Sequence, residues 1–323
     1  MYETPFHNRD LSDLSFLVTG GAGFIGSHIV EYLLTHKASK VVVLDNLLTG
    51  QKSNVDLFAS HDNYQFINGD ICNIDDCRKA CDGIDYVLHQ AALGSVPRSI
   101  NDPVATNRIN ADGFLNMIVA ARDANVKRFV YASSSSVYGD HPGLPKVEDK
   151  TGNPLSPYAV TKATNELYAK VFGDVYNMPI IGLRYFNIFG PRQDPNGPYA
   201  AVIPLFITLM KNGEAPVLNG DGKQTRDFTF VANAVQANVR ALFANDDALG
   251  KVYNVAVGEN FSLLDLTDCL REVLNVDIQP KHRDDRPGDI RNSLADISLA
   301  EKLLGYKPTV RFKEGLKMTA AAF

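Results

Sequence analysis

The chain has 323 residues, of which 45% are hydrophobic and 21% charged, and its formal net charge is −5. These values are typical of a globular protein that can bury a large core without disulfide or metal support. An acidic chain without a cluster of basic residues repels phosphate polymers, so we expect no nucleic-acid partner.

A short strand, a glycine-rich turn and a helix are predicted near the start of the chain. Residues 16–19 are β-prone, and residues 27–36 carry apolar side chains at helical spacing. Gly20, Gly23 and Gly26 lie between them, where the pyrophosphate of a dinucleotide would rest against the helix N-terminus. A glycine turn without a ligand is the alternative, but this triplet has the strand–turn–helix context of the fingerprint.

Acidic residues follow the second and third predicted strands. Residues 41–44 end at Asp45, about 20 positions after the glycine triplet, where a carboxylate binds the adenosine ribose and repels a 2′-phosphate. NAD is therefore predicted rather than NADP. Asp70 and Ile71 end the third strand and are placed for the adenine edge, although a helix-capping role for Asp70 is a serious alternative.

Three of the four cysteines, Cys72, Cys77 and Cys81, lie within ten residues. Their spacing is not that of a zinc site and no histidine pair completes a ligand set, so we expect no metal and interpret them as helix packing. Few thiols, a polar N-terminus and no apolar run of about 18 residues predict a cytoplasmic protein without membrane association.

Strands and helices alternate along the first 190 residues. Buried strands are predicted at residues 86–89, 129–132 and 180–184, with helices at residues 109–121 and 158–176 between them. This alternation predicts an α/β fold, a Rossmann-type doubly wound parallel sheet.

Turn clusters follow Gly190, and the predicted elements become shorter. We expect a smaller C-terminal α/β substrate lobe that ends in a helix at residues 297–304, while residues 252–255 return to the sheet. The predicted NAD-binding domain comprises residues 1–190 and about 228–258, and the predicted nucleotide-sugar-binding lobe comprises about 191–227 and 259–323.

A tyrosine and a lysine are predicted on one helix face, because Tyr158 and Lys162 are four residues apart. A free tyrosine is a poor base at neutral pH, but a nearby ammonium and a nicotinamide cation both favour the phenolate. Four serines, residues 133–136, follow a strand whose carboxyl end should face the cofactor crevice. A surface Tyr–Lys pair and a serine-rich loop without function are the alternatives.

These motifs, together with Asp45-Asn46 and Arg184-Tyr185-Phe186-Asn187, resemble the extended short-chain dehydrogenase/reductase superfamily from about residue 16 onward. Within it the chain most resembles UDP-hexose 4-epimerases, and more closely the subgroup that acts on UDP-N-acetylglucosamine and UDP-N-acetylgalactosamine. The stretches that carry this closer similarity are residues 89–97, 138–142, 192–197 and 219–222. The resemblance implies reversible 4-epimerisation through a 4-keto sugar with tightly bound NAD. The sequence does not fix the pathway, for which polysaccharide biosynthesis is one hypothesis.

The resemblance also implies roles for individual residues. Tyr158 is the acid and base at the sugar 4-hydroxyl, Ser134 hydrogen-bonds the same oxygen, and Lys162 holds the nicotinamide ribose. The expected cofactor-binding residues are Gly20, Gly23, Phe24, Ile25, Gly26, Asp45, Asn46, Gly50, Asp70, Ile71, Gln90, Ala91, Ala92, Asn110, Tyr158, Lys162 and Phe186. The expected substrate-binding residues are Gly94, Ser95, Ser134, Ser136, Tyr158, Asn187, Ala201, Val202, Asn219, Arg226, Arg286, Asp289 and Ser293.

Several positions bear on the choice among related activities. Sugar 4,6-dehydratases carry Thr-Asp-Glu where this chain has Ser134-Ser135-Ser136, and UDP-glucuronate decarboxylases usually carry Glu at the last of these. Arg226 and Arg286 match positions that pair with the diphosphate, with surface salt bridges as the alternative. Ser293 matches a position where epimerases restricted to glucose and galactose carry tyrosine, so we expect N-acetylated sugars to react better.

Other functions stay open at this stage. The plain UDP-glucose/UDP-galactose pair, a UDP-glucuronate-type 4-epimerase, another nucleotide-sugar oxidoreductase and a non-catalytic NAD(H)-binding sensor are the alternatives. The helices at residues 109–121 and 158–176 resemble the pair that forms a four-helix dimer interface in the family, so a homodimer is expected. Tyr168, Val171, Phe172 and Val175 could equally pack within one chain.

Overall fold

A seven-stranded parallel sheet forms the centre of the computed structural model, which describes residues 1–196, 200–284 and 291–323. The strand order is β11-β6-β5-β4-β1-β2-β3, and every neighbouring pair is parallel. This architecture confirms the predicted Rossmann-type α/β fold. The strands are β1 (Ser15–Thr19), β2 (Lys40–Asp45), β3 (Tyr64–Asn68), β4 (Tyr86–His89), β5 (Arg128–Ser134), β6 (Ile180–Tyr185) and β11 (Lys251–Val255).

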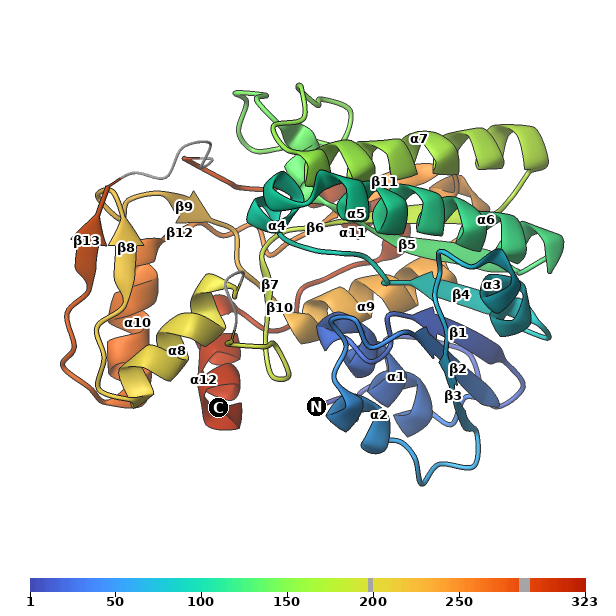
Figure 1. Ribbon diagram of the computed structural model, residues 1–323, viewed down its shortest axis with the longest axis horizontal. Coiled ribbons are helices and arrows are strands. Elements are labelled where there is room, and N and C mark those ends of the chain that lie inside the picture. Colours follow the sequence, from blue (N-terminus) through green and yellow to red (C-terminus); the bar gives the residue numbers. More distant parts are fainter. Residues whose placement is uncertain (197–199, 285–290) are drawn as a thin grey trace.

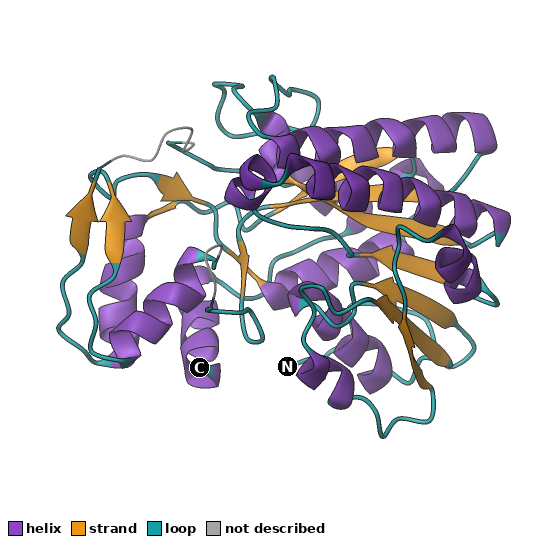
Figure 2. Ribbon diagram, viewed as in Figure 1, coloured by secondary structure: helices purple, strands orange, loops and turns teal. Residues whose placement is uncertain are grey.

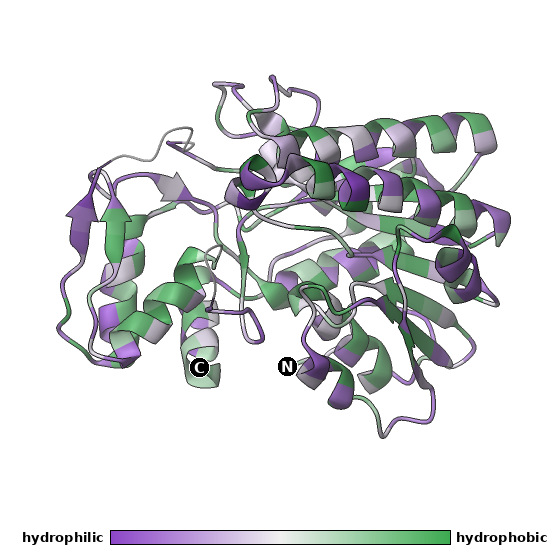
Figure 3. Ribbon diagram, in the orientation of Figure 1, coloured by the Kyte–Doolittle hydropathy of each residue, from purple (hydrophilic) through white to green (hydrophobic). Residues whose placement is uncertain are grey.

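Helices cover both faces of the sheet because successive strand residues point to opposite faces and both sets are apolar. Phe16 and Val41 pack with the core on the side of α1 and α9, whereas Leu17 and Val42 pack with the core beneath α3, α6 and α7. Figures 1 and 3 show this arrangement, with hydrophobic strands between the two helical layers. These helices are α1 (Phe24–Thr35), α3 (Ile74–Cys81), α6 (Gly113–Asp123), α7 (Pro157–Tyr176) and α9 (Val231–Leu242).

Shorter elements connect these helices and strands. The predicted helix at residues 109–121 begins with a π-helical turn, η1 (Arg108–Asp112), which continues into α6. The remaining connecting elements are α2 (Lys52–Asp56), α4 (Val96–Asn101), α5 (Pro103–Asn107), η2 (Ser135–Tyr138) and η3 (Asp246–Ala248).

The cysteines of α3 contribute to the core, since Cys77 and Cys81 are fully buried beside α6. Within the described residues, no group of three His, Cys, Asp or Glu side chains could hold a metal ion. No helix in this part of the chain is both long and apolar enough to cross a membrane.

A smaller lobe lies beside the carboxyl edge of the sheet (Figure 2). Its helices are α8 (Val202–Lys211), α10 (Leu263–Leu274) and α12 (Phe312–Ala322). Its strand pairs are β8 (Val217–Asn219) with β13 (Lys281–Arg283) and β9 (Thr225–Arg226) with β12 (Phe261–Ser262), and β7 (Ile188–Phe189) pairs with β10 (Thr229–Phe230).

Two features of the C-terminal part differ from expectation. Helix α12 was not predicted from the sequence, because Gly315 interrupts its apolar pattern. This glycine lets the helix approach the Phe230 ring, since a Cβ at its position would lie 2.8 Å from the nearest ring atom. Helix α11 (Ser298–Leu304), which was expected in the lobe, packs on strand β11 of the sheet and on helix α9, which covers the sheet. Strand β11 does return to the sheet, and the exact division into two units stays a prediction.

Candidate active site

A cavity of about 760 Å³ opens at the carboxyl ends of β1, β4, β5 and β6. The strand order reverses between β1 and β4, and ligands of doubly wound sheets bind at this switch point. The predicted site residues that line the cavity are Gly20, Gly23, Phe24, Ile25, Gly26, Asp45, Asn46, Gly50, Asp70, Ile71, Gln90, Ala91, Ala92, Gly94, Ser95, Ser134, Ser136, Tyr158, Lys162, Asn187, Arg226 and Ser293.

The glycine turn between β1 and α1 requires residues without side chains at two positions. A Cβ on Gly20 would lie 2.7 Å from Ala91 N, and one on Gly26 would lie 2.1 Å from Gly20 O. Helix α1 begins after Gly23 without any side-chain cap, so its first backbone N–H groups can bind an anion. The turn therefore fits the pyrophosphate of a dinucleotide.

Asp45 organises the adjacent part of the cavity. Its carboxylate accepts hydrogen bonds from Ala22 N at 3.0 Å and Leu47 N at 2.8 Å. Burial raises the pKa of Asp45, and these two N–H donors lower it. Because a carboxylate has about four acceptor positions, it can still bind ribose hydroxyls while it disfavours a 2′-phosphate.

Asp70 does not cap a helix in this structure. Its carboxylate accepts a hydrogen bond from Cys72 N at 2.8 Å, two residues along the chain. The cap of α3 is Asn73, whose side chain accepts from Asp75 N at 3.0 Å. The capping alternative is therefore wrong, and Asp70 instead shapes the turn that lines the cavity.

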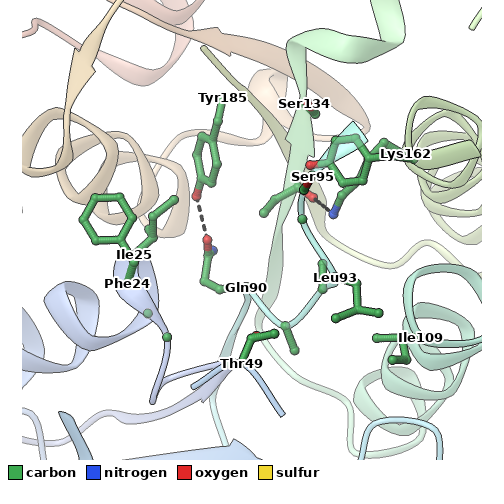
Figure 4. Close-up of a pocket in the computed structure, with 18 of the residues that line it drawn as sticks. Phe24, Ile25, Thr49, Gln90, Leu93, Ser95, Ile109, Ser134, Lys162 and Tyr185 are labelled. Carbon is green, nitrogen blue, oxygen red and sulfur yellow. Dashed lines mark hydrogen bonds between the residues drawn. The ribbon is translucent and has the colours of Figure 1, made fainter. Parts of the chain in front are cut away.

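Tyr158 and Lys162 lie on the first turns of α7. Ser156 caps this helix by accepting a hydrogen bond from Ala159 N at 3.1 Å, and a proline follows the cap at the first helical position. Lys162 Nζ lies 6.0 Å from the centroid of the Tyr158 ring and donates to Ala132 O at 2.8 Å. Figure 4 shows Lys162, Ser134 and Ser95 on one side of the cavity and Phe24 and Ile25 on the other.

The electrostatics of this pair differ in part from expectation. Burial raises the pKa of Tyr158, and a hydrogen bond with Ser134 lowers it. Burial also lowers the pKa of Lys162 to about 8, while Glu166 raises it. Ser134 is thus one protein group that favours the phenolate, while the nearby Lys162 ammonium donates a hydrogen bond to the Ala132 carbonyl.

Some expected site residues do not line the cavity. Asn110 is buried within η1, where its amide accepts from Leu93 N at 2.7 Å and donates to Leu93 O at 3.0 Å. Phe186 is fully buried against the Tyr138 ring. The expected substrate residues Ala201, Val202 and Asn219 lie outside the cavity lining, and Asn219 accepts from Arg283 Nε at 2.6 Å. Arg286 and Asp289 lie outside the described residues.

The structure adds residues that the sequence interpretation did not assign. Tyr185 lines the cavity and donates a hydrogen bond to Gln90 Oε1 at 2.9 Å, while Asn238 Nδ2 donates to its hydroxyl at 2.7 Å. Gln193 also lines the cavity, and its Oε1, like Ser136 Oγ, is buried without a hydrogen-bond partner among the described residues. Such atoms are available to a ligand. The position of Tyr185 at the end of β6 was a signal that could have indicated it.

Comparisons with known proteins agree with this geometry. Residues 16–256 match the NAD dependent epimerase/dehydratase family. A putative UDP-glucose 4-epimerase of Methanocaldococcus jannaschii is 38% identical over 303 residues, which are 93% of this chain and 95% of the relative.

Two solved structures are similar over nearly their whole length. A UDP-N-acetylglucosamine 4-epimerase from Methanobrevibacter ruminantium M1, in complex with UDP-N-acetylmuramic acid, is 43% identical with a TM-score of 0.91 and covers 96% of this chain and 98% of its own. A UDP-glucuronic acid 4-epimerase from Bacillus cereus, in complex with UDP-glucuronic acid and NAD, is 33% identical with a TM-score of 0.89 and covers the same shares.

Proposed function

The chain belongs to the NAD-dependent epimerase/dehydratase family, and we propose that it interconverts the C4 epimers of a UDP-hexose, with UDP-N-acetylglucosamine and UDP-N-acetylgalactosamine as its preferred pair. The observation that carries this proposal is the convergence of Tyr158, Ser134 and Lys162 on one cavity with the glycine turn. The residues after Ser134 are hydroxyls, so the site lacks the carboxylates that elimination or decarboxylation would require there.

The proposed reaction uses few groups of the chain. Tyr158 removes the proton of the sugar 4-hydroxyl and returns it to the 4-keto oxygen, and Ser134 hydrogen-bonds the same oxygen in both steps. When bound, NAD supplies the acceptor and donor for the C4 hydride. Lys162 holds the cofactor ribose and adds positive charge near the phenolate. Lys162 is buried and Tyr158 and Ser134 are half-buried, which limits the access of water to them.

Inversion requires that either face of C4 can be presented to the same tyrosine. The sugar must therefore turn while the nucleotide stays anchored, which requires small side chains around the hexose. The lining includes Gly94, Ser95, Ser136 and Ser293, all of them small. We propose that Arg226 and Asn187, on the lobe side of the cavity, anchor the UDP.

The charge of the described part of the cavity lining supports a neutral hexose rather than a uronic acid as the proposed substrate. Within the described part of its lining, the cations are Lys162 and Arg226. Lys162 is committed to Ala132 O and the cofactor, and Arg226 is proposed for the diphosphate, which leaves neither for a sugar carboxylate. A UDP-glucuronate 4-epimerase is the alternative, supported by the similarity to the Bacillus cereus enzyme.

We also propose that two copies pair through α7. Beside the exposed Lys170–Asp174 pair, this helix exposes several apolar side chains, which is unusual for a solvated helix. The exposed hydrophobic residues on it are Val160, Leu167, Tyr168, Val171, Val175 and Tyr176. A mass measured in solution close to that of one chain would contradict the pairing.

The proposal is tested by incubating the purified protein with one UDP-sugar at a time and following the anomeric proton by NMR. We expect UDP-N-acetylglucosamine to yield its C4 epimer faster than UDP-glucose and much faster than UDP-glucuronate. Ser293→Tyr fills space beside the sugar, so we expect it to lower turnover of the acetylated pair more than that of the plain pair. Unchanged turnover of UDP-N-acetylglucosamine in this variant would contradict the assignment of Ser293.

A further inference from the structure

A buried carboxylate lies one helical turn beyond Lys162 on the same side of α7. Glu166 accepts hydrogen bonds from Arg184 Nε at 2.9 Å and Nη2 at 2.8 Å, so the two side chains form a two-pronged ion pair. They are only 15% and 4% exposed. Glu166 also accepts a hydrogen bond from Ser133 Oγ at 2.5 Å. A carboxylate removed from water needs such partners, and their geometry fixes its position.

Two hydrogen bonds tie the end of β5 to α7. Lys162 Nζ donates to Ala132 O, and Ser133 Oγ donates to Glu166, so neighbouring strand residues bond to helix residues one turn apart. Ser134 follows directly and forms the hydrogen bond that lowers the pKa of Tyr158. The placement of Ser134 against Tyr158 therefore depends on how the preceding two strand residues are held.

Glu166 also acts on the charge of Lys162. Burial lowers the pKa of Lys162 to about 8, and the negative charge of Glu166 is the protein contribution that opposes this change. Arg184 fixes Glu166 from β6 and is itself held by a hydrogen bond from Nη1 to Glu148 O at 2.9 Å. The ion pair of Glu166 and Arg184 thus fixes the segment of β5 that carries Ser133 and Ser134.

We propose that Glu166 is a positioning residue for the reaction, which holds Ser133, and with it Ser134, in register with Tyr158 and Lys162. This inference rests on the proposed epimerase function, since it assigns a role to a group behind the reacting residues. A purely structural ion pair would stabilise the fold without changing how activity depends on pH.

The test is Glu166→Gln in the NAD-loaded enzyme, with Asp174→Asn as the matched control. Asp174 lies four residues after Lys170 on the same helix, as Glu166 does after Lys162, and pairs with it at 2.9 Å, but the pair is exposed. Because hydrogen bonds to a charged group contribute about 1.5–3 kcal/mol, we expect Glu166→Gln to lower kcat by roughly 10- to 100-fold with KM little changed. Asp174→Asn should change neither constant.

The pH profile separates positioning from simple destabilisation. Without the carboxylate the charged form of Lys162 is less favoured, so the alkaline limb of kcat should move to lower pH in Glu166→Gln and stay in place in Asp174→Asn. An unmoved alkaline limb, or a kcat equal to that of the unmodified protein, would overturn the proposal.

A second variant keeps the test decisive if Glu166→Gln does not fold. Ser133→Ala removes one hydrogen bond to Glu166 but keeps the charge. We expect a drop in kcat of about 3- to 10-fold, smaller than in Glu166→Gln because the carboxylate and its ion pair with Arg184 remain, with the alkaline limb unmoved. An unchanged kcat in Ser133→Ala would overturn the positioning role.

A binding measurement distinguishes failure of this inference from failure of the proposed function. NADH fluorescence titrations across pH report the charge of Lys162 without any sugar substrate. If the unmodified protein converts no UDP-hexose, the epimerase proposal fails. The role of Glu166 is still supported if, as the pH rises, NADH affinity falls at a lower pH in Glu166→Gln than in the unmodified protein. Identical binding curves for both proteins would overturn it.

Discussion

The half of the cavity at the ends of β1 and β2 contains a glycine turn with no room for side chains, whereas the half that faces the small lobe presents polar side chains to the cavity. Near the cofactor site, Gly20 and Gly26 leave no room even for a methyl group. On the lobe side, Ser136 and Gln193 present buried oxygen atoms without hydrogen-bond partners among the described residues. The cofactor side can therefore accept a single ligand shape. The lobe side can change its ligand through side-chain substitutions that leave the fold intact.

The largest expected effect is at Tyr158, which lies where the two halves meet. Tyr158→Phe removes the only proposed proton acceptor and donor, so kcat should fall by about 10²- to 10⁴-fold while NAD stays bound. Epimer formation followed by NMR and the absorbance of released cofactor measure the two properties. Tyr168→Phe, on the exposed side of the same helix, is the control. Substantial epimerisation by Tyr158→Phe would show that another group moves the proton.

A smaller loss of activity is expected from Gly26→Ala, which tests only the half of the cavity that contains the glycine turn. Its Cβ would lie 2.1 Å from Gly20 O, so the turn must shift and the free energy of unfolding should fall by about 1–3 kcal/mol, with loss of bound NAD. Gly173→Ala is the matched control, because the nearest atom to its Cβ is Met178 O at 3.9 Å. In a helix interior this change should stabilise the protein by about 0.5–1 kcal/mol. Retention of NAD by Gly26→Ala would show that the turn is less constrained than its geometry indicates.

The contrast between the halves also explains what could be predicted from sequence. The glycine turn, Asp45 and the pair Tyr158 and Lys162 are local motifs at strand ends, and parallel strands bring their ends to one edge of the sheet. Asn110 was expected near the cofactor through the family resemblance, but the π-helical turn directs its amide to the Leu93 backbone.

Positions on the lobe side depend on contacts that no local pattern encodes. Gln193 enters the cavity because the loop after β7 folds back onto α1. Ser293 reaches it because its backbone N–H bonds to Thr225 O at 3.2 Å. Such pairings between distant segments follow from the tertiary structure, so the sequence predicted Ser293 only through its resemblance to a family.

The smallest expected effect is on the pH dependence of stability and concerns His28, which connects α1 to the loop at Pro191. His28 lies on α1, its Nε2 contacts Pro191 O at 2.9 Å, and its Nδ1 lies 3.0 Å from the Tyr2 hydroxyl. Burial lowers its pKa to about 3. Because this is below the value of about 6.5 in an unfolded chain, the unfolded state binds more protons between these pH values, and stability is lost as the pH falls.

We therefore expect the free energy of unfolding to decrease between pH 7 and pH 5 by up to about 1.4 kcal/mol per pH unit for this one group. His28→Gln should lose less stability over that range in chemical denaturation, while His61→Gln, at an exposed position, should behave like the unmodified protein. His89, whose pKa burial also lowers to about 3, contributes equally to all three proteins and cancels in the comparison. Equal acid sensitivity in His28→Gln would show that the connection between α1 and the Pro191 loop does not depend on a neutral imidazole, and the ion pair between Arg192 and Glu31 would then be the polar link between them.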